Sequence, residues 1–401
     1  MNFNPRIIEI SDMKQSYQEL TKIGCDPVGI HIMGPKAVFK VMKVECISVK
    51  AANLLKQTFL AKGGEVAVSR DTAGLTAEQT DVLIFATLKQ YRKALTQLQQ
   101  QPWGLPELAD AMMSVLAAQD SPIIRDYDQR QPVLQITPGR TLVMGILNVT
   151  PDSFSDGGRY NDRERAVEQV AAMVRDGADI IDIGAESTRP YGAKPITAVE
   201  EMDRLLPLLR HVLAISPVPI SVDTYKAEVA DAALQMGAHL INDIWGLQGD
   251  PQMASVVAKH KVPVVIMHNQ VGTHYEQDIM GSLCHFLQRG IQVGRDAGIA
   301  QENFIVDPGI GFGKTLPQNL TVMARLAELH ALGCPVLAGT SRKRFIGEVL
   351  ALPVEERLEG TAATVALAIT KGVHIVRVHD VKTMSRIAKM TDSMRGRMND
   401  E

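Results

Sequence analysis

Short apolar runs rich in β-branched residues recur through the second part of the chain, and segments with helical periodicity separate them. We expect eight of these runs to be strands, at residues 142–148, 179–183, 219–223, 238–244, 263–267, 304–307, 335–338 and 373–378. Eight strands that alternate with helices over about 260 residues predict an α/β fold, a (β/α)8 TIM barrel. An open doubly wound sheet is the alternative, because periodicity does not show whether a sheet closes.

The first part of the chain predicts a smaller unit. An amphipathic helical pattern over residues 51–62 stops at two glycines, and residues 65–68 and 82–86 have the composition of strands. Further helical patterns lie at 89–99 and 105–116. These elements predict a small α/β or α+β domain, and none of its motifs indicates a chemistry.

A stretch with three prolines and little helical periodicity separates the two parts. The sequence therefore predicts an N-terminal domain at residues 1–118, a linker at 119–138 with room for a short strand, and a barrel at 139–401.

Composition narrows the class of protein. The 42 Lys and Arg residues nearly balance the 45 Asp and Glu residues, which argues against a nucleic-acid partner. No apolar stretch approaches the roughly 18 residues that a membrane span needs, and the N-terminus lacks the pattern of a secretory signal. The four cysteines are scattered without a CxxC motif, which is typical of reduced thiols in the cytoplasm. We expect a cytoplasmic enzyme that acts on small molecules.

A polar or ionisable residue lies at the end of every predicted barrel strand or in the loop that follows it. In a (β/α)8 barrel the chemistry lies where strands end and βα loops begin. The polar groups that follow the eight strands in order are Asn148, Glu186–Arg189, Asp223, Asn242-Asp243, His268, Asp307, Ser341–Lys343 and Arg377–Asp380. Helix capping explains single cases of this kind but hardly all eight, so we expect this rim to be an active site.

The residue types at the rim restrict the ligand. Asp223, Asn242 and Asp307 offer the acceptors that suit a planar nitrogen heterocycle with N–H groups. Lys343 and the Arg377–His379 segment bring positive charge and donors to strands seven and eight, where barrels often bind phosphate. Phosphate next to Asn148 suggests Mg²⁺, which takes few protein ligands.

Two loops of the barrel have further features. Gly309, Gly311 and Gly313 let the backbone approach a ligand closely after strand six. The polar loop at residues 150–160 has two adjacent glycines, and we expect it to act as a lid.

Seven motifs, in order, resemble those of the dihydropteroate synthase family. They are MGILNVTPDSFSDGG at 144–158, ESTRP at 186–190, SVDT at 221–224, IND at 241–243, DPGIGFGK at 307–314, TSRK at 340–343 and RVHD at 377–380. The resemblance spans about two thirds of the chain, from residue 138 to 394, and leaves the N-terminal domain unexplained.

The resemblance implies an activity and a set of site residues. The family condenses (7,8-dihydropterin-6-yl)methyl diphosphate with 4-aminobenzoate, which gives dihydropteroate and pyrophosphate. It is a target of sulfonamides and is usually dimeric, so a homodimer is expected. Carried over, the pterin ring would be held by Asp223, Asn242, Asp307 and Lys343, of which Asp307, Lys343 and Asp223 would also be catalytic. The diphosphate would be held by Thr188, Arg377 and His379, and Mg²⁺ by Asn148. The aminobenzoate pocket would be shaped by Phe154, Arg189, Pro190, Phe312 and Lys343, with Asp156 ordering the lid.

The chain departs from the family pattern in a few places. Tyr191-Gly192-Ala193 alters the second loop, and Ala185 stands where glycine is usual. The residues after His268 also differ from the usual pattern, and we expect His268 to support the site rather than to touch the ligand. Two other readings are open: a methyltetrahydrofolate-dependent methyltransferase of the same barrel group, and a catalytically silent barrel that binds pterin.

Overall fold

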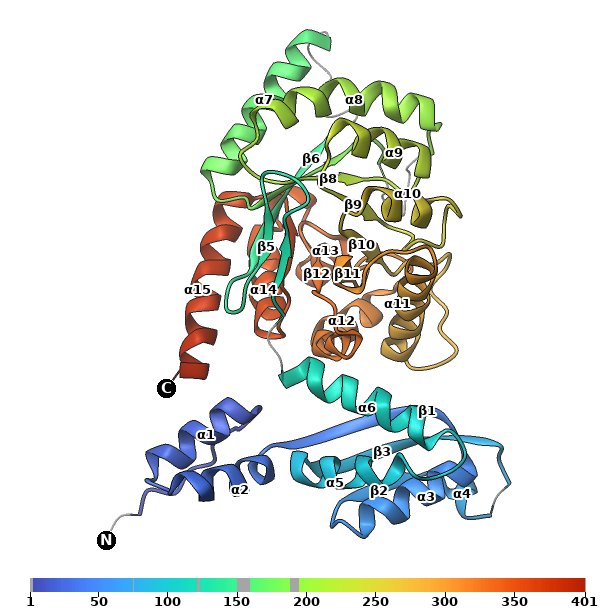
Figure 1. Cartoon of the computed structure of the whole chain (residues 1–401). Coiled ribbons are helices and arrows are strands. Elements are labelled where there is room, and N and C mark those ends of the chain that lie inside the picture. Colours follow the sequence, from blue (N-terminus) through green and yellow to red (C-terminus); the bar gives the residue numbers. More distant parts are fainter. Residues whose placement is uncertain (1–2, 75, 121–122, 150–158, 188–194, 401) are drawn as a thin grey trace. The chain divides into compact units, whose positions relative to one another are not determined.

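The computed structural model describes residues 3–74, 76–120, 123–149, 159–187 and 195–400. The chain forms two compact units (Figure 1), one of residues Met1–Ser121 with Gly396–Glu401, the other of Pro122–Arg395. No helix in the described part of the chain is both long and apolar enough to cross a membrane.

The larger unit is a barrel of eight parallel strands. In spatial order they are β11 (Phe304–Asp307), β10 (Val264–Met267), β9 (Leu240–Asp243), β8 (Ile220–Asp223), β7 (Ile180–Gly184), β6 (Leu142–Asn148), β13 (Ile375–Val378) and β12 (Leu337–Ala338). The two ends of this sheet meet through a parallel bridge between Val306 and Val336, and the Val306 amide donates to the carbonyl of Pro335 at 2.9 Å. The barrel predicted from the sequence is confirmed, and the open sheet is wrong.

Helices surround the strands on the outside (Figure 1). They are α7 (Arg159–Arg175), α8 (Ala198–Ile215), α9 (Ala227–Met236), α10 (Met253–His260), α11 (Ile279–Asp296), α12 (Leu316–Ala324), α13 (Arg344–Leu350), α14 (Leu358–Thr370) and α15 (Val381–Asp400). Side chains alternate along each strand, so one set packs on these helices and the other fills the barrel. On β6, for example, Val143 and Leu147 join the outer core, whereas Leu142 and Met144 join the inner one.

A short hairpin packs against the inner core at the amino-terminal ends of the strands. It consists of β4 (Arg125–Tyr127) and β5 (Leu134–Ile136), and Tyr127, Leu134 and Ile136 are buried with the inner strand residues. The Tyr127 hydroxyl donates to the carbonyl of Glu302, just before β11, at 2.9 Å. The segment that was expected to be a linker therefore contains part of the barrel unit. The sequence allowed a short strand here, but the few apolar residues and the prolines concealed that two strands pair as a hairpin.

The hairpin leads to a prediction about deletions. Removal of residues 1–121 should leave a barrel that unfolds cooperatively, because this cut spares the hairpin. Removal of residues 1–135 should lower the melting temperature by roughly 10 °C or more, since it exposes the inner core that Tyr127 and Leu134 cover. Thermal unfolding followed by circular dichroism compares the two variants. Equal melting temperatures would contradict a structural role for the hairpin.

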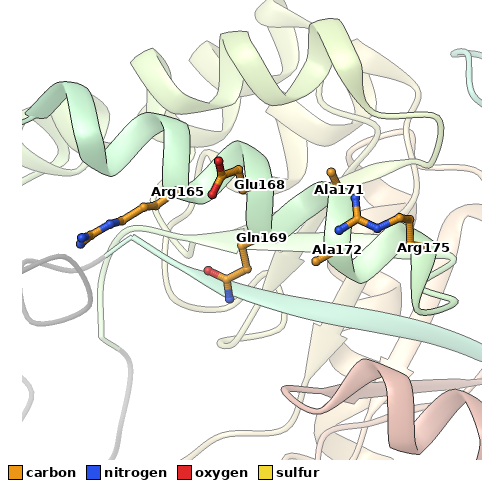
Figure 2. Close-up of a pocket in the computed structure, with 6 residues that line it drawn as sticks. All are labelled: Arg165, Glu168, Gln169, Ala171, Ala172 and Arg175. Carbon is orange, nitrogen blue, oxygen red and sulfur yellow. The ribbon is translucent and has the colours of Figure 1, made fainter.

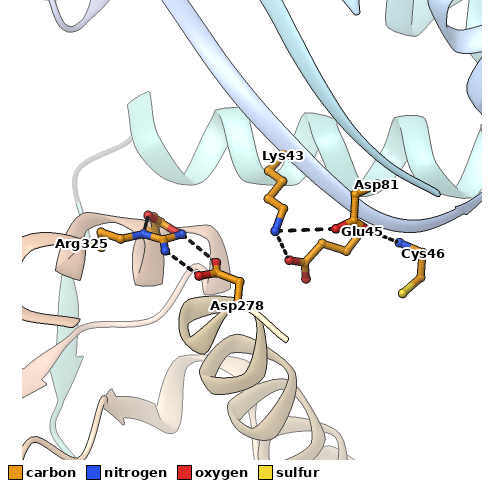
Figure 3. A network of polar contacts seen from close by, with 7 residues as sticks. Lys43, Glu45, Cys46, Asp81, Asp278 and Arg325 are labelled. Atoms are coloured by element: carbon orange, nitrogen blue, oxygen red, sulfur yellow. Dashed lines mark hydrogen bonds and ion pairs between the residues drawn. The ribbon is translucent and has the colours of Figure 1, made fainter. Parts of the chain in front are cut away.

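The smaller unit is a three-stranded antiparallel sheet with helices. Its strands β1 (Phe39–Ser48), β3 (Gln79–Thr87) and β2 (Glu65–Val68) lie in this order, with β3 in the middle. The helices are α1 (Met13–Lys22), α2 (Pro27–Ala37), α3 (Val49–Leu60), α4 (Arg70–Gly74), α5 (Leu88–Leu98) and α6 (Leu105–Asp120). One sheet face packs on α3, α5 and α6. At the edge of the sheet, Lys43 pairs with Glu45 and Asp81 (Figure 3).

Candidate active site

The inner face of the barrel changes from apolar to polar between one inward-facing position of a strand and the next. Ile180, Leu240, Ile305 and Ile375 belong to the inner apolar core. Side chains two positions further along a strand point to the same side. Those positions are occupied by Asp182, Asn242, Asp307 and Arg377, and Asp223 ends the neighbouring strand β8. A layer of charged and amide groups therefore lies on the apolar core, near the carboxyl ends of the strands.

Arg377 connects this polar layer. Its Nε donates to Asp182 Oδ2 at 2.6 Å, and its Nη2 donates to Asp223 Oδ2 at 2.7 Å. Asn242 Nδ2 donates to the same oxygen of Asp182 at 3.2 Å. We expected Arg377 to bind diphosphate; the structure shows that two of its N–H groups are engaged by buried carboxylates.

Sequence reasoning missed Asp182. Its side chain is completely buried, and the run DIIDI was interpreted only as an apolar strand. The position was detectable, because Asp182 follows the inward-facing Ile180 by two residues, as Asp307 follows Ile305. Asp243 is the opposite case, because we placed it among the polar groups of the rim. Its carboxylate accepts hydrogen bonds from the backbone N–H groups of Trp245 and Leu247 and is not part of the polar layer.

Three buried oxygens of this layer lack a partner among the described residues. They are Asp182 Oδ1, Asp223 Oδ1 and Ser221 Oγ. A buried polar atom without a hydrogen bond is costly, so such atoms mark a place where a ligand is expected to bind. Two of the three are carboxylate oxygens, which accept only, and this matches a ligand rich in N–H groups.

Burial also changes the acid–base behaviour of these carboxyl groups. It raises the pKa of Asp307 to about 6, against the opposing effect of the Gly309 N–H group. It raises the pKa of Asp223 as well, although the positive charge of Arg377 acts in the opposite direction. For Arg377, burial is outweighed by Asp182 and Asp223, which raise its pKa above the ordinary value, so it stays charged.

An apolar surface lies beside the polar layer. Ile244, Met267 and Phe312 form a small buried cluster, and Tyr225 and Trp245 pack against it. The Lys343 ammonium lies over the Phe312 ring, 4.1 Å from its centre, in a cation–π contact. The site therefore combines apolar side chains with directional polar groups, as a pocket for a planar heterocycle requires.

The loop after β11 approaches its neighbours very closely. The Gly309 N–H group donates to Asp307 Oδ1 at 2.7 Å. Gly309 has a φ of 65°, and a Cβ there would lie 1.9 Å from the backbone oxygen of His268. The close approach therefore requires glycine at this position, and it orients the Asp307 carboxylate.

The last two strands carry the groups expected to contact phosphate. Ser341 Oγ accepts from the His379 amide at 3.1 Å and lies 3.0 Å from His379 Nδ1. Burial, with the charges of Arg377 and Arg342, lowers the pKa of His379 to about 4, so this imidazole is neutral. Arg342 forms two hydrogen bonds with Asp380, of 3.0 and 2.6 Å. These contacts hold the segment that begins α15.

The metal prediction depends on a single side chain of the described part. Asn148 ends β6 and is partly exposed, and its amide oxygen is a suitable ligand for Mg²⁺. Within the described ranges, no group of three or more His, Cys, Asp or Glu side chains could hold a metal ion.

Several expected residues lie outside the described part of the chain. These are Phe154 and Asp156 of the first loop, and Thr188, Arg189, Pro190 and the altered Tyr191–Ala193 stretch of the second. The chain just before the second loop is described: Glu186 pairs with Lys226 and accepts a hydrogen bond from Tyr225 at 3.1 Å.

A hollow along α7 is a separate feature (Figure 2). Its lining residues are Arg165, Glu168, Gln169, Ala171, Ala172 and Arg175, all from one helix. None of them belongs to the polar layer inside the barrel.

Comparisons with known proteins show which family the barrel resembles. The model of the pterin binding enzyme family matches residues 144–379. A dihydropteroate synthase from Bacillus subtilis is 55% identical over 255 residues, which are 64% of this chain and 89% of that protein. The crystal structure of a Clostridium difficile dihydropteroate synthase with pteroic acid superposes with a TM-score of 0.63 at 50% identity, over 64% of this chain and 97% of that one.

One relative extends over the smaller unit too. A Halobacterium salinarum protein named as a probable bifunctional folylpolyglutamate synthase/dihydropteroate synthase is 37% identical over 397 residues. The match covers 96% of this chain and 47% of that protein. The smaller unit therefore accompanies the barrel in this relative as well.

Proposed function

Because the chain belongs to the pterin binding enzyme family, we propose that it catalyses the dihydropteroate synthase reaction of folate biosynthesis. It condenses (7,8-dihydropterin-6-yl)methyl diphosphate with 4-aminobenzoate to 7,8-dihydropteroate and pyrophosphate, in the cytoplasm. The observation that carries this proposal is the polar layer in the barrel, with buried carboxylate oxygens that lack partners among the described residues.

The polar layer would bind the pterin ring. Asp307 and Asp223 accept hydrogen bonds from ring and amino N–H groups, and Asn242 offers both an acceptor and a donor. Lys343, held over Phe312, donates to ring oxygen or nitrogen atoms. The flat ring lies along Ile244 and Met267 of the apolar cluster, and the Phe312 ring at the edge of that cluster, with Lys343, faces 4-aminobenzoate.

The diphosphate would lie above Arg377. A guanidinium has five N–H groups, and two of those of Arg377 are engaged by Asp182 and Asp223. The others are available to phosphate oxygens, together with His379 and Asn148; the resemblance assigns Thr188, outside the described residues, to the same role. Asn148 would hold Mg²⁺ beside the diphosphate, and the bound ion would supply positive charge that neutralises the leaving group.

The reaction then follows from these charges. The C–O bond breaks with its electron pair on the diphosphate oxygen, next to Arg377 and His379. Positive charge develops on the pterin methylene, close to the Asp223 and Asp307 carboxylates, which stabilise it. The amine lone pair of 4-aminobenzoate forms the new C–N bond, and the nitrogen loses a proton to water.

Release of pyrophosphate tests this proposal. The purified protein with pterin diphosphate and Mg²⁺ should release pyrophosphate only when 4-aminobenzoate is present, with an equal amount of dihydropteroate. Release without product would indicate hydrolysis. Pterin binding without release would favour a silent barrel, and methyl transfer from methyltetrahydrofolate would favour the methyltransferase.

The raised carboxyl pKa values predict a pH dependence. The N–H groups of the pterin need ionised acceptors, so kcat/KM for the pterin diphosphate should rise at least tenfold per pH unit below 6 and level off only above the pKa of Asp223, which burial raises to about 7. With saturating pterin diphosphate, the profile measured by varying 4-aminobenzoate should break at a lower pH, since the bound ring stabilises the carboxylates. A flat profile for the pterin diphosphate between pH 5 and 8 would contradict these roles.

The same groups affect stability with the opposite sign. Because burial raises their pKa, Asp223 and Asp307 hold protons in the folded protein that the unfolded chain releases. Their contribution to stability is therefore lost as pH rises from about 4 to the folded-state pKa, which is about 6 for Asp307 and about 7 for Asp223.

We propose that the enzyme is a homodimer. Exposed apolar side chains gather on α13, α14 and the turn between them, and this is the surface we assign to the partner. They are Val349, Leu350, Val354, Leu358 and Leu367. Light scattering of the purified protein measures the mass directly.

A further inference from the structure

Two buried ionisable side chains near the site have no part in the proposed chemistry. Lys314 is only 7% exposed and His268 only 2%. The Lys314 ammonium lies 3.0 Å from His268 Nδ1, and it donates to the backbone oxygens of Gly309 at 2.9 Å and Phe312 at 3.0 Å. Three acceptors thus meet the three N–H groups of one ammonium.

The charge state and the orientation of the His268 ring both suit a hydrogen bond from Lys314. Burial lowers the pKa of His268 to about 3, and the charge of Lys314 acts in the same direction. The imidazole is therefore neutral, and Nδ1 accepts from Lys314. Tyr275 stacks on the ring with 6.0 Å between ring centres, and Phe286 contacts it edge-on at 4.9 Å.

The charged groups that affect Lys314 belong to the candidate active site. Burial lowers the pKa of Lys314 to about 7, Asp307 opposes this shift, and Lys343 adds to it. Burial of the ammonium is costly, and its three hydrogen bonds offset only part of that cost.

The bonds of Lys314 end on the loop that carries Phe312. The Phe312 amide donates to the Gly309 carbonyl at 3.1 Å, so the two backbone oxygens that Lys314 binds belong to one turn. The Phe312 ring projects from this turn and lies beneath Lys343. His268 follows β10, and Lys314 therefore connects the ends of two neighbouring strands.

We propose that Lys314 and His268 are positioning residues that hold the Phe312 turn in place and thereby set the affinity for 4-aminobenzoate. This inference rests on the proposed function, because it deepens the role of the same site. Neither side chain needs to touch a substrate. A purely structural contact would change only the stability of the protein. The Lys314–His268 contact, here called the strut, should instead change the affinity for 4-aminobenzoate more than the affinity for the pterin diphosphate.

The test compares Lys314→Met with the unchanged protein. Methionine keeps the length of the side chain but donates no hydrogen bond, so the turn loses its anchor. We expect KM for 4-aminobenzoate to rise roughly tenfold, and the Kd of the pterin diphosphate in calorimetry to stay within about twofold. An unchanged KM, or an equal loss of pterin affinity, would overturn the proposal.

Two variants of His268 provide a matched control that leaves Lys314 in place. His268→Gln keeps an acceptor for the ammonium and should raise the KM for 4-aminobenzoate by less than about threefold. His268→Leu removes the acceptor and should resemble Lys314→Met. Equal KM values for the glutamine and leucine variants would refute the hydrogen bond as the cause.

A second readout is independent of turnover. In protein labelled with 4-fluorophenylalanine, the resonance of Phe312, assigned with Phe312→Leu, should shift and broaden in Lys314→Met. An unaltered resonance would refute the strut. Absence of turnover in the unchanged protein would instead refute the proposed function, and the fluorine spectrum would still decide on the strut.

Discussion

Asp307→Asn is expected to lower kcat/KM for the pterin diphosphate by roughly a thousandfold. The Asp307 Oδ1 atom accepts from Gly309 N–H at 2.7 Å. An asparagine keeps this bond only with its oxygen there, which turns its NH₂ group toward the N–H groups of the pterin. Two donors then face each other, and the negative charge beside the developing cation is lost. Stopped-flow or steady-state kinetics, with calorimetry of pterin binding, measure both effects.

Asp243→Asn is the matched control for this variant. Asp243 also ends a strand, is only 1% exposed, and has a pKa raised by burial to about 6. Its carboxylate binds backbone N–H groups instead of facing the polar layer. This variant should lose some stability but keep its kcat within about threefold. A loss of activity like that of Asp307→Asn would show that buried charge alone, without its direction, explains the effect.

Arg377→Ala is expected to have the second large effect, on both rate and stability. It removes the donors for the diphosphate and leaves Asp182 and Asp223 without their shared cation. Removing one partner of a buried ion pair typically costs about 3–5 kcal/mol. We expect an unfolding free energy lower by about this amount at pH 7, and a rate of pyrophosphate formation near background.

The stability deficit of Arg377→Ala should also depend on pH, in a direction that can be checked. Without Arg377, whose charge lowers the pKa of Asp223, the Asp223 carboxyl group takes up a proton more readily, so the deficit in stability should shrink as pH falls from 7 to 5. Arg325→Ala serves as the control, because Arg325 also pairs with two carboxylates, Asp278 (Figure 3) and Glu328, but its side chain is 34% exposed. It should cost about 1 kcal/mol or less and leave kcat unchanged. An Arg377→Ala protein as stable as the control variant would contradict the buried ion pairs.

The strands of the barrel were predictable because parallel strands buried on both faces are nearly continuous apolar runs. The polar residues at their ends interrupt those runs, and this made Asp223, Asn242, Asp307 and Arg377 visible as candidates. Asp182 was not visible in the same way, because it lies within its apolar run rather than at the end. Only the alternation of inward and outward positions, counted from Ile180, separates it from the strand interior.

Contacts across the barrel could not be predicted from the sequence. The pairing of Arg377 with Asp182 joins residues 195 positions apart, and no local pattern indicates it. The hairpin at residues 125–136 escaped for a similar reason, since its two short strands bury three side chains only against distant strands. Roles for Lys314 and His268 also depend on such a contact.

The same long-range contacts set the order in which the protein can form during synthesis. The smaller unit leaves the ribosome first, and its sheet is complete once residue 87 has emerged. The hairpin comes next, but Tyr127 and its acceptor Glu302 are 175 positions apart, so it must wait for most of the barrel. Arg377 lies in the last strand, and a chain released before it would carry Asp182 and Asp223 without their cation. Chains released before this strand should therefore expose apolar side chains of the inner core and depend strongly on chaperones.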